Sequence, residues 1–305
     1  MSKRTYTIAT RASNLAYTQA LITLEALKKT HPTSNFEILK LKTKGDSNYT
    51  APLSQFRGEG VFVKELEYAL YDKRADFAVH SLKDIPSHVP EDLELTSFLP
   101  RETPNDVFIT ADKKDFRSLK ENAVIGSGSP RRIVQMRQQR PDFSFTNIRG
   151  NLETRLKKLY NGDYDAIILA AAGLKRLKKQ ISEHWVLPLD IMLPAIGQGA
   201  ITIQCRKNDA EIQQMVRAIN DRNTEIAVQA ERIFMKIMEG GCRIPLAAYA
   251  QIRGDAFFMN ATVGDQTLQR LEALFKTGQV TEYEKIAEQM AHELKTICRN
   301  KSIEY

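Results

Sequence analysis

The chain has few cysteines, no long apolar run, and no motif of a structural metal site. Its three cysteines, Cys205, Cys242 and Cys298, are an odd number at wide spacing, without a CxxC pair or a Cys/His cluster. This argues against a disulfide framework and against structural zinc. The longest uncharged run, residues 191–205, is broken by Pro194 and two glycines and is shorter than the ~20 apolar residues of a membrane span. We therefore expect neither a metal nor a membrane partner.

The sequence also lacks targeting segments and nucleotide-binding motifs, which bears on where the protein acts and what it binds. The first residues lead straight into a polar–apolar alternation, without the apolar core of a signal peptide or the long Arg/Ser-rich stretch of a transit peptide. We therefore expect a cytoplasmic protein. The Gly-rich stretches at 58–60 and 126–128 complete neither the dinucleotide fingerprint nor a P-loop, and no repeat is present.

The composition is that of a globular protein with a basic balance. The 305 residues are 42% hydrophobic, which suits two or three domains with real cores. The net charge is +7 and the pI is about 9.2. This charge indicates an anionic partner. It does not distinguish between nucleic acid, a membrane surface and a polycarboxylate ligand.

Hydrophobic periodicity predicts two α/β lobes and a small α+β domain. We expect residues 1–100 with 198–219 to form the first lobe, 101–197 the second, and 220–305 the C-terminal domain. The strongly apolar strand at 165–170 is typical of a parallel sheet. The predicted strands are 6–10, 36–41, 76–79, 93–98, 106–110, 123–126, 143–148, 165–170, 200–205, 246–252, 257–263 and 267–274; the predicted helices start after Ser13 and at 62–71, 130–139, 151–160, 223–238 and 282–298.

Basic residues recur just after predicted strands. Ligands of open α/β sheets bind outside the carboxyl ends of the strands, so these cations are candidates for a shared cleft between two lobes. Any one of them is more often a solvated surface residue, and only their number favours a site. They are Arg11, Lys83, Arg131 with Arg132, Arg149, Arg155 and Arg176.

Ser129-Pro130 predicts a helix start that suits an anion. Serine is a good N-cap and proline is favoured at the first helical position. The free N–H groups and the positive end of the helix dipole attract anions, and Arg131 and Arg132 add planar forks that match carboxylates.

Two further residues each have a functional and a purely structural interpretation. Asp84 beside Lys83 could stabilise a developing positive charge or move a proton, and it could equally form a turn before Pro86. Cys242 follows two glycines and could be an accessible nucleophile, although an isolated cysteine is more often a small buried apolar residue. Cys205 and Cys298 fit that second description.

Taken together, the motifs resemble the porphobilinogen deaminase (hydroxymethylbilane synthase) family. The matching stretches run in order over nearly the whole chain and are specific only jointly. They are residues 8–13 (IATRAS), 62–66 (FVKEL), 78–84 (AVHSLKD), 126–132 (GSGSPRR), 148–151 (IRGN), 154–155 (TR), 164–170 (YDAIILA), 172–176 (AGLKR), 193–199 (LPAIGQG) and 239–242 (EGGC).

The resemblance implies two lobes of the periplasmic-binding-protein type with a central cleft, and a third domain carrying the cofactor cysteine. It implies a dipyrromethane bound to Cys242 by a thioether. Four porphobilinogen units would be condensed onto it with loss of ammonia, and hydrolysis would release hydroxymethylbilane for uroporphyrinogen III synthase. A monomer without a nucleic-acid partner is expected.

The resemblance also implies roles for single residues. Asp84 is the expected catalytic carboxylate, which would stabilise the cationic azafulvene left by deamination. Each porphobilinogen carries an acetate and a propionate, so guanidinium groups suit the growing polyanion. The expected cofactor ligands are Cys242, Lys83, Ser129, Arg131, Arg132, Arg149 and Arg155; the expected substrate ligands are Arg11, Ser13, Phe62, Arg176 and Gln198.

The sequence departs from the family pattern at residues 52–60. The family usually shows Pro-Leu-x-Lys-x-Gly-Gly-Lys-Gly, whereas Gln55 and Glu59 replace the lysines here and Arg57 is new. Ser127 and Gly128 also stand where Thr and Ser are usual. A non-catalytic anion-binding protein of the same fold is therefore the alternative, and a basic nucleic-acid-associated protein is a weaker third.

Overall fold

The computed structural model describes residues 4–43, 63–179, 184–239 and 244–305. The chain divides into two compact units, one formed by segments up to residue 102 and by 200–225, the other by 103–199 and 226–305. The described residues form three sheets. The predicted class is confirmed: an α/β chain with two sheet-bearing lobes and a small C-terminal domain. The domain boundaries and the central cleft stay predictions.

The first lobe is built on a mixed five-stranded sheet of order β2-β1-β3-β10-β4. β1 pairs in parallel with β2 and β3, and β10 lies antiparallel between β3 and β4. The predicted strand at 200–205 therefore does return to this lobe. The elements are β1 (Thr5–Arg11), α1 (Asn14–Thr30), β2 (Asn35–Leu41), α3 (Lys64–Tyr71), β3 (Phe77–Ser81), η2 (Leu82–Asp84), β4 (Leu93–Phe98), β10 (Ile201–Arg206) and α7 (Ala210–Arg217).

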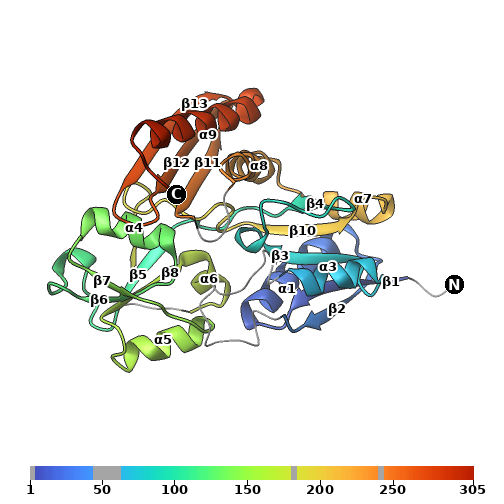
Figure 1. Ribbon diagram of the computed structural model, residues 1–305. Helices are drawn as coiled ribbons and strands as arrows, with labels where there is room; N and C mark the ends of the chain where they lie inside the picture. The colour runs from blue at the N-terminus through green and yellow to red at the C-terminus, as the bar shows by residue number, and fades with distance from the viewer. Residues whose placement is uncertain (1–3, 44–62, 180–183, 240–243) are drawn as a thin grey trace. The chain divides into compact units, whose positions relative to one another are not determined.

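Helices cover both faces of this sheet (Figure 1). Successive strand residues point to opposite faces, so Ile8 and Ala9 enter different cores. Ile8 packs with α1 and α7, whereas Ala9 packs with α3. Because both faces are buried, the strands β1 and β3 hold their carboxyl ends, with Arg11 and Asp84, in fixed positions at one sheet edge.

The second lobe has its own mixed sheet of order β7-β6-β8-β5-β9. In Figure 1, α4 lies on one side of this sheet and α5 on the other. The elements are β5 (Asp106–Thr110), η3 (Phe116–Ser118), β6 (Val124–Gly126), α4 (Pro130–Gln139), β7 (Ser144–Thr146), α5 (Leu152–Tyr160), β8 (Ala166–Ala170), α6 (Ala171–Arg176) and β9 (His184–Val186).

The parallel-sheet prediction for residues 165–170 was only half right. β8 pairs in parallel with β6 but antiparallel with β5. Its uniformly apolar sequence reflects burial on both faces, because Ile168 packs in the core with α4 and Ile167 in the core with α5. Two-sided burial therefore does not fix the direction of a neighbouring strand.

The C-terminal domain is an antiparallel sheet of order β11-β12-β13 with α8 and α9 packed on it (Figure 1). The predicted strand at 267–274 was placed too early. Asp265 organises a turn instead, its Oδ1 accepting bonds from the backbone N–H groups of Gln269 (2.8 Å) and Arg270 (3.0 Å). The elements are α8 (Arg222–Ile237), β11 (Leu246–Arg253), β12 (Ala256–Gly264), β13 (Leu271–Gln279), η4 (Val280–Glu282) and α9 (Tyr283–Asn300).

Candidate functional site

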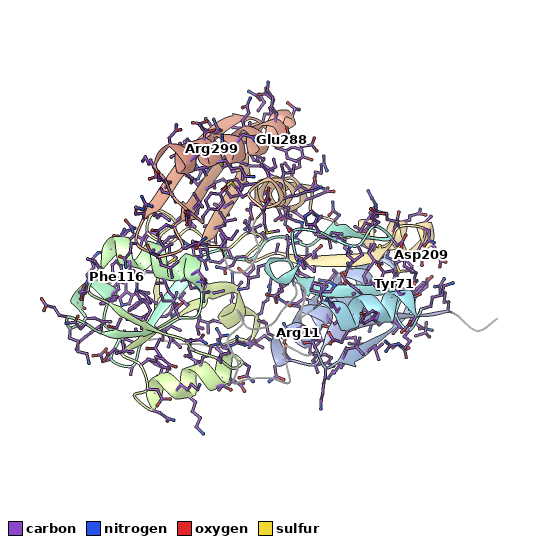
Figure 2. The ribbon with its side chains drawn as sticks, in the orientation of Figure 1. Arg11, Tyr71, Phe116, Asp209, Glu288 and Arg299 are labelled. Carbon is purple, nitrogen blue, oxygen red and sulfur yellow. The ribbon has the colours of Figure 1, made fainter. Side chains whose placement is uncertain are left out.

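In the first lobe, a cation and a carboxylate meet at the carboxyl ends of two parallel strands. Arg11 is the last residue of β1, and Asp84 ends the short helix η2 that follows β3. The Nη1 atom of Arg11 lies 3.5 Å from Oδ2 of Asp84, and their side chains are 20% and 32% exposed. Figure 2 labels Arg11 at the end of its strand. The pair is held by buried strands and remains accessible to a ligand.

The neighbouring predicted residues lie in the same strand-to-helix connections. Ser13 is the N-cap of α1, and its Oγ accepts a bond from the backbone N–H of Ala16 (3.3 Å). The hydroxyl proton can still be donated to an anion. Lys83 is half-buried in η2, beside Asp84. Phe62 lies outside the described residues.

In the second lobe, Ser129-Pro130 does begin a helix. Ser129 occupies the N-cap position of α4 and Pro130 the first turn, as predicted. The Ser129 hydroxyl makes no capping bond, however; its backbone N–H instead donates to Oγ of Ser127 (3.3 Å). The Ser129 side chain is half-buried at the helix start.

Arg131 and Arg132 are buried rather than solvated. They are 5% and 8% exposed, and both reach Asp106, the fully buried first residue of β5. Arg131 Nη1 lies 2.7 Å from Oδ2, and Arg132 Nη2 lies 2.7 Å from Oδ1. Gln198 joins the same carboxylate through its Nε2 (3.0 Å) and donates also to the carbonyl of Pro104 (2.7 Å). Arg131 and Arg132, predicted together, therefore form one cluster with Gln198, which was predicted separately.

Asp106 is ionised in this cluster. Burial by itself raises the pKa of the Asp106 carboxyl, but the positive charges of Arg131 and Arg132 lower it by more, to well below its usual range. Burial lowers the pKa of Arg131, and Asp106 opposes that change. The cluster consequently holds two cations and one anion.

Three more predicted cations follow β7 and β8. Arg149 has a buried Nη2 atom that finds no hydrogen-bond partner within the described part of the chain, and burial lowers the pKa of Arg149. Arg155, in α5, donates from Nε to the carbonyl of Gly150 (2.8 Å). Arg176 ends α6, and its Nη2 donates to the carbonyl of Gly199 (2.6 Å).

The strand directions explain why these cations share one edge. β6 pairs in parallel with both β7 and β8, so their carboxyl ends lie on the same side of the sheet. The connections and helices that follow these strands carry the cations: Arg131 and Arg132 in α4, Arg149 before α5, Arg155 in α5 and Arg176 at the end of α6. The sequence-based expectation of strand-end cations thus holds within this lobe.

Several predicted features fall outside the described residues. These are Cys242, with the Gly-Gly pair before it, and the departing loop positions Gln55, Arg57 and Glu59. The other two cysteines, Cys205 and Cys298, are free and buried, as expected for apolar packing residues. Within residues 4–43, 63–179, 184–239 and 244–305, no cluster of His, Cys, Asp or Glu could hold a metal ion, and no helix is suited to cross a membrane.

Sequence reasoning missed two buried carboxylates. Asp106 was placed only as a strand start, and Glu231 only within a helix. Glu231 is fully buried and accepts bonds from the backbone N–H groups of Gly197 (2.7 Å) and Ala250 (2.9 Å). Asp106 opens an otherwise apolar strand, and Glu231 shares a helix face with the apolar residues Val228 and Phe234. An acid at such a position is the signal that could have found both, because such a charge needs a buried partner.

Cations follow the carboxyl ends of parallel strands in each of the two α/β sheets, and guanidinium groups suit a protein that acts on a carboxylate-bearing ligand. Family models agree. Residues 6–214 match the model of "porphobilinogen deaminase, dipyromethane cofactor binding domain", and residues 225–296 match that of "porphobilinogen deaminase, C-terminal domain".

A curated relative gives the same family. A porphobilinogen deaminase of Oceanobacillus iheyensis is 44% identical over 260 residues, covering 85% of this chain and 84% of the relative. Similar solved structures include the periplasmic VFT2 domain of BvgS from Bordetella pertussis (15% identity, 70% and 86% of the two chains, TM-score 0.42). The probable extracellular-binding protein ytmK from Bacillus subtilis is another (13% identity, 70% and 89%, TM-score 0.43).

The chain belongs to the porphobilinogen deaminase family. It is therefore a transferase of tetrapyrrole biosynthesis that uses a dipyrromethane cofactor, with porphobilinogen as substrate. Membership supports the predicted reaction, in which four porphobilinogen units are joined and hydroxymethylbilane is released, over the non-catalytic alternative.

Proposed function

We propose that Asp84 is the catalytic carboxylate and that strand-end cations bind the carboxylates of substrate and cofactor. The observation that carries this proposal is the Arg11–Asp84 pair, whose 3.5 Å contact joins two partly exposed side chains at the ends of parallel strands. A ligand carboxylate can bind Arg11 while its pyrrole N–H donates to Asp84. The pair thus supplies both halves of a site for an acidic pyrrole.

Asp84 acts on charge that develops as ammonia leaves. Loss of the amine leaves a positive charge on the substrate pyrrole, and a fixed carboxylate stabilises that charge without reorganising. Arg11 holds the carboxylate of Asp84 in place. The role of Asp84 is therefore electrostatic as well as hydrogen-bonding.

The cofactor carries an acetate and a propionate on each ring, and the cations of the second lobe fit such a group. Arg149 retains a buried Nη2 atom with no partner among the described residues, as a missing anionic ligand would leave it. Lys83, Ser129, Arg131, Arg132, Arg149 and Arg155 would hold the cofactor carboxylates, and Cys242 would carry the thioether. When bound, dipyrromethane supplies the pyrrole position to which the first substrate unit is joined.

The remaining roles concern the substrate units. Arg11, Ser13 and Arg176 would bind their carboxylates, Phe62 would pack against the rings, and Gln198 would act through the Asp106 cluster it contacts. A cytoplasmic monomer that passes its product to uroporphyrinogen III synthase and binds no nucleic acid is what the family resemblance favours. Sedimentation velocity tests the monomer, and a steep salt-dependent affinity for DNA or RNA would contradict the last point.

Intact-protein mass spectrometry and turnover test the proposal together. The purified chain should carry a dipyrromethane adduct, and peptide mapping should place it on Cys242. Asp84→Ala should retain the adduct and lose nearly all turnover, because it removes charge stabilisation and leaves the cations. Asp92→Ala, at an exposed acid before β4 in the same lobe, is the matched control and should turn over normally. Wild-type turnover in Asp84→Ala would remove Asp84 from the mechanism.

A further inference from the structure

Asp106 is the only anion that contacts the guanidinium groups of Arg131 and Arg132 among the ion pairs of the described residues. Its two oxygens are divided between them, one for each arginine, at 2.7 Å. Gln198 adds a third donor at 3.0 Å. Asp106 lies on β5 and the arginines in the first turn of α4, so the carboxylate ties a helix start to the sheet.

Backbone carbonyls complete the orientation of both guanidinium groups. Arg131 Nη1 also donates to Leu193 (2.7 Å), and Arg132 Nη1 donates to Ile168 (2.9 Å). Each fork is thus fixed by the carboxylate and by one further bond, which sets both its position and its plane. Nε of Arg132 is buried and has no hydrogen-bond partner among the residues that the structure describes.

The charges in this cluster do not cancel. Two cations share one anion, and both stand at the N-terminal end of a helix, where the dipole disfavours positive charge. Without a counter-ion, two buried guanidinium groups would repel each other and separate. With Asp106 as the counter-ion, the cluster is stable and still keeps an excess positive charge, which favours binding of an additional anion.

We propose that Asp106 is a positioning residue for the reaction: it orients Arg131, Arg132 and Gln198 and leaves one net positive charge for a carboxylate of the cofactor. The inference rests on the proposed function, because it assumes that these arginines serve the cofactor. Asp106 itself does not touch the ligand in this scheme. Its effect is exerted through the two guanidinium groups.

Two substitutions separate charge from shape. Asp106→Asn keeps the shape but removes the anion and turns an N–H₂ group toward a guanidinium. Asp106→Glu keeps the anion but displaces it by one methylene. The matched control is Asp142→Asn, because Asp142 pairs with Arg140 at the same 2.7 Å in the same lobe, with a 29% exposed carboxylate.

The full-length variants are purified and compared with wild type by circular dichroism, intact mass and steady-state kinetics on porphobilinogen. Because Asp106→Asn removes the anion that both guanidinium groups share, we expect a fall of about tenfold in its adduct-bearing fraction, with a folded spectrum. Asp106→Glu should restore most of the adduct and raise KM by about threefold to tenfold, with kcat within about twofold of wild type. Asp142→Asn should match wild type throughout.

The outcomes decide the proposal in each case. A fully loaded Asp106→Asn with a wild-type KM overturns it. If Asp106→Asn does not fold, Asp106→Glu decides, and a folded Glu variant with unchanged adduct and KM overturns it as well. A Glu variant that also fails to fold assigns Asp106 a purely structural role, which is equally a refutation. A wild-type chain without adduct would instead contradict the proposed function itself.

Discussion

His80 should make the first lobe sensitive to mild acid. It lies in β3, is 5% exposed, and is close enough to Arg11 for the two charges to interact. Burial lowers the pKa of His80 to about 4, the Gln204 side chain partly opposes this, and Arg11 lowers the pKa further. The imidazole is therefore neutral at pH 7, and adds no positive charge beside the Arg11–Asp84 pair.

The size of the effect follows from proton linkage. An unfolded histidine has a pKa of about 6.5, so below that pH the unfolded chain binds a proton that the folded chain refuses until about pH 4. A depressed folded-state pKa means that the contribution is fully present above pH 6.5 and is lost as the pH falls toward 4. Between about pH 8 and pH 5 the loss is about 2 kcal/mol. Aspartates titrate mainly below this window.

Urea unfolding at about pH 8 and about pH 5 measures this difference. With a slope of about 2 kcal/mol per M, the wild-type midpoint should fall by about 1 M from this group. His80→Gln introduces a neutral side chain of similar size, so it should remove the part of the fall in urea midpoint that His80 causes. His292→Gln, at an exposed position of α9, is the matched control and should keep the wild-type shift.

The comparison between the two variants carries the result, since all other groups titrate alike in both. If His80→Gln loses as much stability between the two pH values as wild type, burial does not hold His80 neutral and the reasoning is wrong. A variant that is less stable at pH 8 but no longer pH-sensitive would still support it.

Two further predictions concern thiols and glycines. Cys205 and Cys298 are buried, and burial raises the pKa of Cys205 to about 11, so the native chain should resist alkylation near pH 8. After unfolding, two thiols should react if Cys242 carries the thioether; three would contradict it. Gly150 has φ +114° and its added Cβ would lie 2.7 Å from Cβ of Thr154, so Gly150→Ala should destabilise by about 1–3 kcal/mol in urea titrations. Gly128→Ala would meet only the Oδ1 and Cγ atoms of the exposed Asn147 side chain, which can rotate, so about 1 kcal/mol or less is expected. Equal losses in the two variants would refute the distinction.

Much of the fold could be predicted because local patterns decide it. Strands β4 and β5 and helix α4 have the predicted bounds, since alternation, Pro130 and the apolar runs are local signals. β13 was misplaced because the Asp265 turn depends on side-chain bonds that periodicity does not register. The short helices α6 and α7 and the strand β9 were not predicted, because each has eight residues or fewer. In α7 the buried Ile212, Met215 and Val216 follow helical spacing, and this local pattern could have indicated the helix.

The candidate site shows the same division. The order of the motifs along the chain was enough to indicate the family, the strand-end cations and Asp84. The motifs did not indicate the partners of those cations, because Asp106 is 25 residues from Arg131 and 92 residues from Gln198 in the sequence. Such contacts exist only when β5, α4 and the segment before β10 pack together. The sequence alone therefore determined which charges this protein carries and in what order; the tertiary structure decided which of them are buried against a counter-ion, because burial and pairing depend on neighbours that the fold brings from far along the chain.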